Sequence, residues 1–133
     1  MQLTTHFTSE EFTCKCGCNS AKMDANFMLM LEDTRMLANI PFKITSGYRC
    51  PTYNVSIGGK MNSAHTRGKA ADIAAITSRH FFAIIKAALK IEFERIGIDF
   101  ERKFVHLDND NSLPQNVLWS YAAKKKGDLN EFL

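Results

Sequence analysis

Two short segments of the chain place ionisable side chains inside runs that are otherwise apolar. In residues 70–76, Asp72 stands among alanines and isoleucines, and His106 lies between aliphatic neighbours in the later segment Phe104–Asp108. Both runs have the length and residue types of β-strands, whose side chains alternate between two faces. Burying a lone carboxylate in such a strand costs several kcal/mol unless the group is paired or binds a metal. The chain must therefore fold so that Asp72 finds a partner.

The parity of the two strands indicates which side chains can meet. His106 and Asp108 share one face of the second strand, and its aliphatic residues share the other. If the strands are neighbours with their aliphatic faces toward the core, Asp72, His106 and Asp108 project together. The alanines beside Asp72 leave the space that a metal and a substrate need. This pattern predicts a polar site on one face of a sheet.

His65 is the third candidate ligand, since it precedes a turn that can fold it back over Asp72. Gly68 permits the backbone angles that a tight reversal requires. Two imidazoles and one carboxylate can supply the three protein ligands of a catalytic zinc site, which keeps a fourth position open for water. The two other histidines, His6 and His80, are interpreted as ordinary structural or exposed residues.

Apolar spacing and capping residues predict the remaining elements. Helices are expected at residues 8–12, 24–38 and 52–57, and from a Thr77-Ser78 cap through Leu89. Asp24 is the expected cap of the second helix, and Asn39 and Pro41 are expected to end it. Strands are expected at residues 42–45, 70–76, 96–98 and 103–108, with an edge strand at 117–121. Helices followed by mostly antiparallel strands with one inserted helix are typical of an α+β fold. We expect one domain over residues 1–133, with a small, mostly antiparallel sheet and helices packed on one face.

Composition narrows the class of protein. A hydrophobic content of 45% with 23% charged residues is that of an ordinary globular domain, and the net charge of +3 is mild. The run Lys124-Lys125-Lys126 is too short for a nucleic-acid patch, so no nucleic acid is expected as partner. No stretch has the length of a membrane span and no signal peptide is visible. We expect a monomer made in the cytoplasm that, if it leaves, does so by a route other than general secretion.

Four cysteines form a separate group, and we assign them a structural role. They are Cys14, Cys16, Cys18 and Cys50. An even number allows two disulfides in 3 possible pairings. The spacing of the first three is too tight for an ordinary zinc knuckle, although three thiolates and Cys50 could hold a structural metal. Reduced thiols are the third alternative.

The motif around the first strand resembles a known family. The run Ser63-x-His65-x-x-Gly68-x-Ala70-x-Asp72, preceded by Ser46-Gly47-Tyr48-Arg49 and followed by His106, resembles the zinc D-alanyl-D-alanine carboxypeptidases. That family includes the vancomycin-resistance dipeptidases and phage L-alanyl-D-glutamate endolysins, and shares its fold with the hedgehog signalling domain. The resemblance covers about residues 7 to 110. The opening Phe7-Thr8-x-x-Glu11-Phe12 with its cysteines is similar to small phage and prophage members.

The resemblance implies both a site and an activity. It implies that His65, Asp72 and His106 hold Zn²⁺, with water in the fourth position. It also implies that Arg49 binds or polarises a carboxylate or the scissile carbonyl, and that Ser63 lies near the substrate terminus. The implied function is that of a zinc D,D- or L,D-carboxypeptidase or endopeptidase, which hydrolyses peptidoglycan stem peptides. A phage or prophage enzyme, released to the cell wall by a phage-type route, fits the same resemblance.

One position departs from the family pattern. Many members carry a glutamate or aspartate three residues before the last histidine as general base, and here that residue is Lys103. Asp108 is the best substitute, because it shares a face with His106, but it can equally orient His106. Asp99 and Glu101 have the opposite parity unless a turn intervenes. Lys103 itself is interpreted as a solvated strand charge.

Two other functions therefore stay open beside the peptidase. The first is a catalytically impaired, zinc-containing module of the same fold that binds cell-wall fragments or serves a structural purpose. The second is a metal-free α+β adaptor in which the histidines are merely packed.

Overall fold

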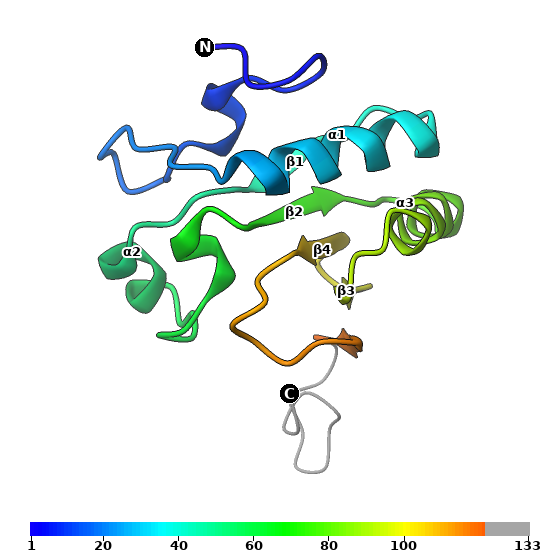
Figure 1. The fold of residues 1–133 in the computed structure, drawn as a ribbon. Helices are drawn as coiled ribbons and strands as arrows, with labels where there is room; N and C mark the ends of the chain where they lie inside the picture. The colour runs from blue at the N-terminus through cyan, green and yellow to red at the C-terminus, as the bar shows by residue number, and fades with distance from the viewer. Residues whose placement is uncertain (122–133) are drawn as a thin grey trace, which may run out of the picture.

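The computed structural model describes residues 1–121, and its fold is α+β, as predicted (Figure 1). The helices are η1 (Ser9–Phe12), α1 (Ala25–Ala38), α2 (Pro51–Ser56), η2 (Ala64–Arg67) and α3 (Ser78–Lys90), where η marks 3-10 helices. The strands are β1 (Ile44–Ser46), β2 (Ala70–Ala74), β3 (Arg95–Asp99), β4 (Phe104–Asp108) and β5 (Val117–Ser120). The run Lys124-Lys125-Lys126, judged from the sequence to be too short for a nucleic-acid patch, lies outside the described residues.

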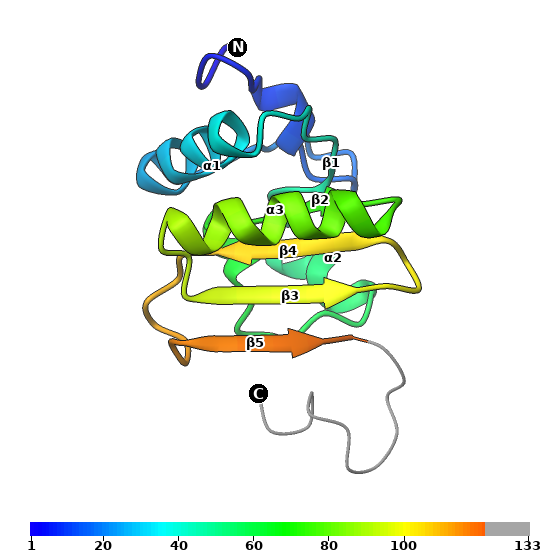
Figure 2. The ribbon, with the colours of Figure 1, turned by 90° about the vertical axis from the view of Figure 1, so that its right-hand side faces the viewer.

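The five strands form one mixed sheet in the order β1-β2-β4-β3-β5. Every neighbouring pair is antiparallel except β3 and β5, which run parallel. The chain leaves β4, passes the start of β3 and lays β5 along the free side of that strand (Figure 2). The predicted mostly antiparallel sheet is thus confirmed, with β5 as an edge strand. The parallel pairing of β5 with β3 was not predicted.

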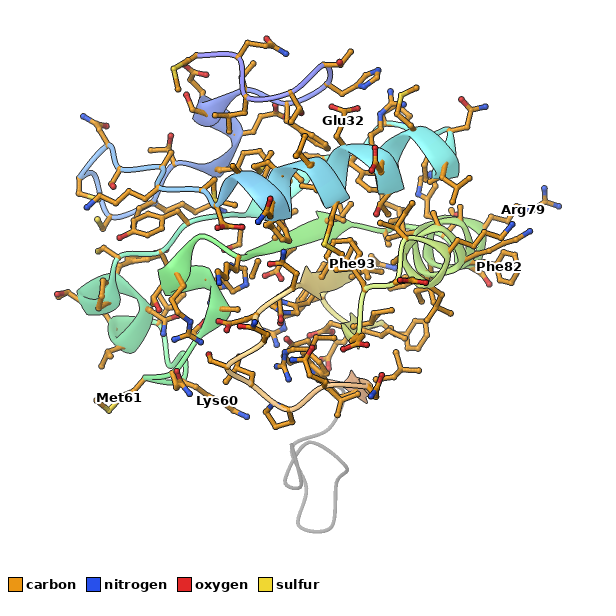
Figure 3. All side chains as sticks on the ribbon, in the orientation of Figure 1. Glu32, Lys60, Met61, Arg79, Phe82 and Phe93 are labelled. Carbon is orange, nitrogen blue, oxygen red and sulfur yellow. The ribbon has the colours of Figure 1, made fainter. Side chains whose placement is uncertain are left out.

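The two long helices and the sheet enclose the core. Figure 2 shows α3 in front of the sheet and the short α2 behind it, so the two sheet faces have different partners. Phe93 lies in the interior beside α1 and α3 (Figure 3), where its ring meets Phe27 edge-on with centroids 6.1 Å apart. The aliphatic side chains of β2, β3 and β4 fill the same core. The expectation of helices on one face holds for α1 and α3, whereas α2 and η2 cover the opposite face.

Local capping explains where the long helices begin and end. The Asp24 carboxylate accepts a hydrogen bond from the N–H of Phe27 at 2.9 Å, and the Thr77 hydroxyl caps α3 in the same way through His80. Asn39 ends α1 with a left-handed φ of 55°. These residues agree with the caps expected from the sequence.

Several strand boundaries differ from the predicted ones, most of them by one or two residues. β1 starts at Ile44 rather than at residue 42, and β2 ends at Ala74, so that Ile76 is exposed. β4 begins at Phe104, because Lys103 belongs to the β3–β4 turn with a positive φ of 61°. The interpretation of Lys103 as a strand charge is therefore wrong: it is an exposed turn residue.

Gly68 fixes the turn that leads from η2 into β2. Its φ is 68°, and a Cβ atom at this position would lie 1.9 Å from the carbonyl oxygen of Lys22. The carbonyl of Gly68 also accepts a hydrogen bond from the N–H of Asp24 at 2.9 Å. The turn that follows His65 is thus pressed against the segment that enters α1.

We predict that Gly68→Ala lowers the free energy of unfolding by clearly more than about 1 kcal/mol, because backbone strain and a steric clash add. Gly58→Ala is the matched control: its φ is 80°, but no atom lies within 4 Å of the added Cβ. Urea unfolding of both variants measures the difference. Equal losses would show that the contact with Lys22 is not limiting.

Candidate metal centre and its pocket

A row of side chains crosses the sheet on the face opposite α3. Asp72 on β2 pairs directly with His106 on β4, which pairs with Gly97 on β3, which in turn pairs with Trp119 on β5. Cross-strand partners project on the same face. The register therefore brings Asp72 and His106 together, as strand parity predicted.

Three candidate ligand atoms converge at one end of this row. The carboxylate Oδ1 of Asp72 lies 2.9 Å from Nδ1 of His106 and 3.3 Å from Nε2 of His65. All three residues are buried, and their ligand atoms lie within 4.8 Å of one another. Zinc bound to nitrogen and oxygen at 2.0–2.2 Å in a tetrahedral site separates its ligands by about 3.4 Å. The observed spacing fits one such ion.

The remaining ring nitrogens of both histidines are held by the protein. Nδ1 of His65 lies 2.7 Å from the carbonyl oxygen of Gly47, to which it donates its proton. Nε2 of His106 lies 2.6 Å from Oδ2 of Asp108. These partners leave Nε2 of His65 and Nδ1 of His106 to face Asp72. Such outer hydrogen bonds fix the tautomer and the ring orientation of metal-binding histidines.

Asp108 is itself fully engaged. Its Oδ1 accepts hydrogen bonds from Nε of Arg95 at 2.8 Å and from the backbone N–H of Asp110 at 3.2 Å. Only 1% of Asp108 is exposed. Arg95 lies over the ring of Trp119, with 5.0 Å between the guanidinium carbon and the ring centroid. Asp108 thus connects His106 to a partly buried cation.

The electrostatics of the metal-free site are those of a buried ion network. Burial disfavours the charged form of Asp72, but the charges and hydrogen bonds of His65 and His106 hold its pKa well below the usual range. Burial would likewise lower the pKa of His106. The hydrogen bonds of Asp108 and Asp72 outweigh burial and raise that pKa to about 9. Without a metal, the positive charge of a protonated His106 therefore partly compensates the negative charges of Asp72 and Asp108.

Arg49 and Ser63 also lie at this site. Arg49 donates from Nε to Oγ of Ser46 at 3.0 Å and from Nη1 to Asn54 at 3.2 Å, while Nη2 is 3.4 Å from Oδ2 of Asp72. Ser63 caps η2, and its hydroxyl oxygen accepts a hydrogen bond from the N–H of His65 at 3.2 Å. Both residues line the same cavity as the three candidate ligands.

That cavity has a volume of about 520 Å³, within the range of small-molecule sites. Sequence reasoning missed several residues of the cavity lining: Lys60, Asn62, Arg102, Trp119 and Tyr121. Side-chain alternation in residues 117–121 could have placed the rings of Trp119 and Tyr121 on one face of their strand. It could not have shown that this strand pairs with β3.

Gly97 shows why the aromatic wall fits over the sheet. A Cβ atom there would lie 2.7 Å from the indole of Trp119 and 2.8 Å from the ring of Tyr121. Gly97 is thus required for these rings to lie across β3. Burial and the nearby charge of Asp72 raise the pKa of Tyr121, so its hydroxyl stays protonated.

The other acidic candidates are placed away from the ligand atoms. The β3–β4 turn brings Asp99 opposite Phe104 on the site face, the exception that the parity argument allowed. Arg102 binds both its oxygens, through the backbone N–H and Nε, each at 2.7 Å. Glu101 is exposed in the turn and does not line the cavity. The carboxylate of Asp99 is thus engaged by Arg102, and that of Glu101 lies outside the cavity lining.

The two remaining histidines lie elsewhere. His6 is 2.5 Å from a carboxylate oxygen of Glu32, and His80 is an early residue of α3. Neither lines the cavity. The four cysteines gather at a second place, where their sulfur atoms lie within 4.8 Å of one another; we call Cys14, Cys16, Cys18 and Cys50 the cysteine cluster.

Comparison with known families assigns the chain to a family of peptidases. A family model described as peptidase M15 matches residues 5–108, which span η1 through β4 and include all three candidate ligands. The chain belongs to the peptidase M15 family, and the resemblance to the zinc D-alanyl-D-alanine carboxypeptidases is thereby confirmed. No curated protein matches the chain significantly. Within residues 1–121, every helix is too short or too polar to span a membrane.

The chain's one tryptophan reports on the candidate metal site, because the Trp119 and His106 rings are 5.4 Å apart. Co²⁺ accepts the same nitrogen and oxygen ligands as Zn²⁺. We predict that Co²⁺ quenches the Trp119 emission of the metal-free protein and that His65→Ala removes most of this quenching. His80→Ala, outside the site, should leave it intact. Equal quenching in His65→Ala and the unaltered chain would contradict the assignment.

Proposed function

We propose that this protein is a zinc-dependent peptidase that hydrolyses amide bonds in short stem peptides of peptidoglycan. The observation that carries the proposal is the convergence of His65, Asp72 and His106 at a cavity that Arg49 also lines. Membership of a peptidase family supports the reaction type. The resemblance to cell-wall enzymes, including phage endolysins, supports the substrate class and a phage or prophage setting.

The donor set suits zinc and the chemistry it provides. Zinc bound by two imidazoles and one carboxylate is a Lewis acid that lowers the pKa of a coordinated water. Because Gly47 and Asp108 hold the outer nitrogens, His65 and His106 present their inner nitrogens in a fixed orientation. Oδ1 of Asp72 faces both inner nitrogens, while its Oδ2 is turned toward Arg49.

Arg49 is the proposed anchor for the substrate. Ser46 and Asn54 fix its guanidinium in place, and its planar set of N–H donors suits a carboxylate or a polarised carbonyl. Lys60 and Arg102 add two more cationic groups to the cavity lining, and Figure 3 shows Lys60 in the loop that follows α2. A cavity with three cations fits a peptide with a free carboxylate. Ser63, which keeps a hydroxyl proton to donate, is the proposed contact for the peptide terminus.

For Asp108, the contacts support a positioning role rather than that of general base. Of the carboxylates that line the cavity, only Asp72 and Asp108 belong to the described part of the chain. One oxygen of Asp108 faces His106, and the other is taken by Arg95 and Asp110. We propose that Asp108 accepts the Nε2 proton of His106 in a hydrogen bond and keeps Nδ1 available for zinc.

The main prediction concerns cleavage. The zinc-loaded protein should release D-alanine or cleaved stems from purified muropeptides, and chelation or His65→Ala should abolish turnover. Arg49→Lys should lower kcat/KM by at least about tenfold, since a point charge replaces the planar donor set. Mass spectrometry of the products identifies the bond. His80→Ala is the matched control and should retain full activity.

A second prediction separates the two roles of Asp108. If Asp108 positions His106, Asp108→Ala should weaken zinc binding by about 10–100-fold. Saturating zinc should then restore much of the turnover. If Asp108 is the base, turnover should be lost at full zinc occupancy with unchanged affinity. A competitive chelator titration, run beside the activity assay, measures both quantities.

One observation favours a second candidate function, a zinc-containing module that binds cell-wall fragments without cutting them. Neither carboxylate of the cavity lining is free to activate water, because Asp72 is a proposed ligand and Asp108 is engaged. That module would bind muropeptides and zinc with normal affinity and yield no product. The cleavage assay therefore decides between the two functions.

A further inference from the structure

The cysteine cluster brings together two segments that are far apart in the chain. Cys14, Cys16 and Cys18 belong to the irregular segment after η1, and Cys50 is the residue before α2. The first three alternate with other residues, so a local turn alone could gather them. Cys50 comes from the loop between β1 and α2, and only the tertiary fold brings it to the other three.

The sulfur positions match a single four-coordinate ion. The sulfur of Cys16 lies 3.4 Å from that of Cys14 and 3.6 Å from that of Cys50. Four sulfurs at 2.3 Å from a tetrahedral zinc are separated by about 3.8 Å. A disulfide requires about 2.05 Å between its two sulfurs and brings only two cysteines together. Here all four sulfurs lie within 4.8 Å of one another, as one shared ligand requires and two separate bonds do not.

A backbone contact supports the same arrangement. The N–H of Cys50 points at the sulfur of Cys14, with 3.3 Å between nitrogen and sulfur. Backbone N–H donors of this kind stabilise the negative charge of metal-bound thiolates. Cys14 is buried and Cys50 partly buried, while Cys16 and Cys18 are exposed, so the cluster has an inner wall and an open side through which an ion can enter.

We propose that the cysteine cluster binds a second, structural Zn²⁺ as a tetrathiolate, separate from the His65–Asp72–His106 site. Four thiolates fill a tetrahedral shell and leave no position for water, so this ion has no catalytic role. Its binding replaces four thiol protons, which are released to solvent.

The second zinc would hold the loop that supports the first site. Between β1 and Cys50 lie Gly47, whose carbonyl fixes His65, and Arg49, which contacts Asp72. The N-terminal segment already reaches this loop through a hydrogen bond from the N–H of Tyr48 to the carbonyl of Phe12, at 2.9 Å. A tetrathiolate joins the same two segments a few residues further along each. We infer that this ion stiffens the support of His65 and Arg49.

Metal content is the first test, made on protein purified without a histidine tag. The unaltered chain should carry about two zinc ions, and His65→Ala and Cys18→Ser should each carry about one. Each variant is the control for the other, because each removes one site. Zinc content unchanged by Cys18→Ser would overturn the proposal. This test measures zinc content and not turnover, so its result is valid even if the protein has no peptidase activity.

Spectroscopy on the same variants identifies the ligands. His65→Ala loaded with Co²⁺ should show the intense near-ultraviolet absorption of sulfur-to-cobalt charge transfer. Cys18→Ser should lose most of that band. Absence of the band from His65→Ala would overturn the proposal.

A third test titrates the thiols of the unaltered protein, so it does not depend on whether a variant folds. Stepwise reaction of the thiols with a mercurial should release one zinc as four thiols react. A purified protein four hydrogens lighter than its sequence, and therefore holding two disulfides, would overturn the proposal. So would four thiols that react without releasing zinc.

Discussion

The pairing of β2 with β4 is the constraint on which the site depends. One register places Asp72 opposite His106 on one face and Ile73 opposite Val105 on the other, inside the core. A slip of one residue would exchange the faces and put a carboxylate and an imidazole among buried aliphatic side chains, at a cost of several kcal/mol. Core packing and site assembly therefore select the same register.

The site is surrounded by partners that restrict each group to one state. Arg95 donates a hydrogen bond to Asp108, Asp108 holds the outer nitrogen of His106, and the Gly47 carbonyl holds that of His65. Each contact is made by a buried or partly buried group, where an unpaired charge would be costly. The candidate ligands are thus oriented before any ion arrives, which reduces the ordering that binding must accomplish.

Strand parity and capping residues predicted much of this arrangement from the sequence. Side-chain alternation requires only local pattern, so the shared face of Asp72, His106 and Asp108 and the cap at Asp24 were accessible. The start of β4 was not, because Lys103 adopts a positive φ that its residue type does not indicate. Asp99 lies on the site face for the same reason, since the β3–β4 turn reverses the parity count.

Long-range partners outside the β2–β4 pair could not be predicted. Nothing in the sequence around Arg95 indicates that it binds Asp108, because that contact depends on the order of strands in the sheet. The clustering of Cys50 with the other cysteines likewise follows from the path of the loop after β1. The sequence left three states open for these thiols, and the sulfur distances supply the geometric reason to favour one.

The position of β5 has a consequence for how such a protein can diversify. The match to the family ends at residue 108, whereas Trp119 and Tyr121 come later in the chain and still line the cavity. The groups that would perform the chemistry thus lie inside the matched portion, whereas part of the cavity lining lies beyond it. β5 is an edge strand that pairs only with β3, so its outer side is free of strand partners in the described part of the chain. Evolution could replace this final strand and alter which peptides fit, while the ancestral chemistry remained untouched.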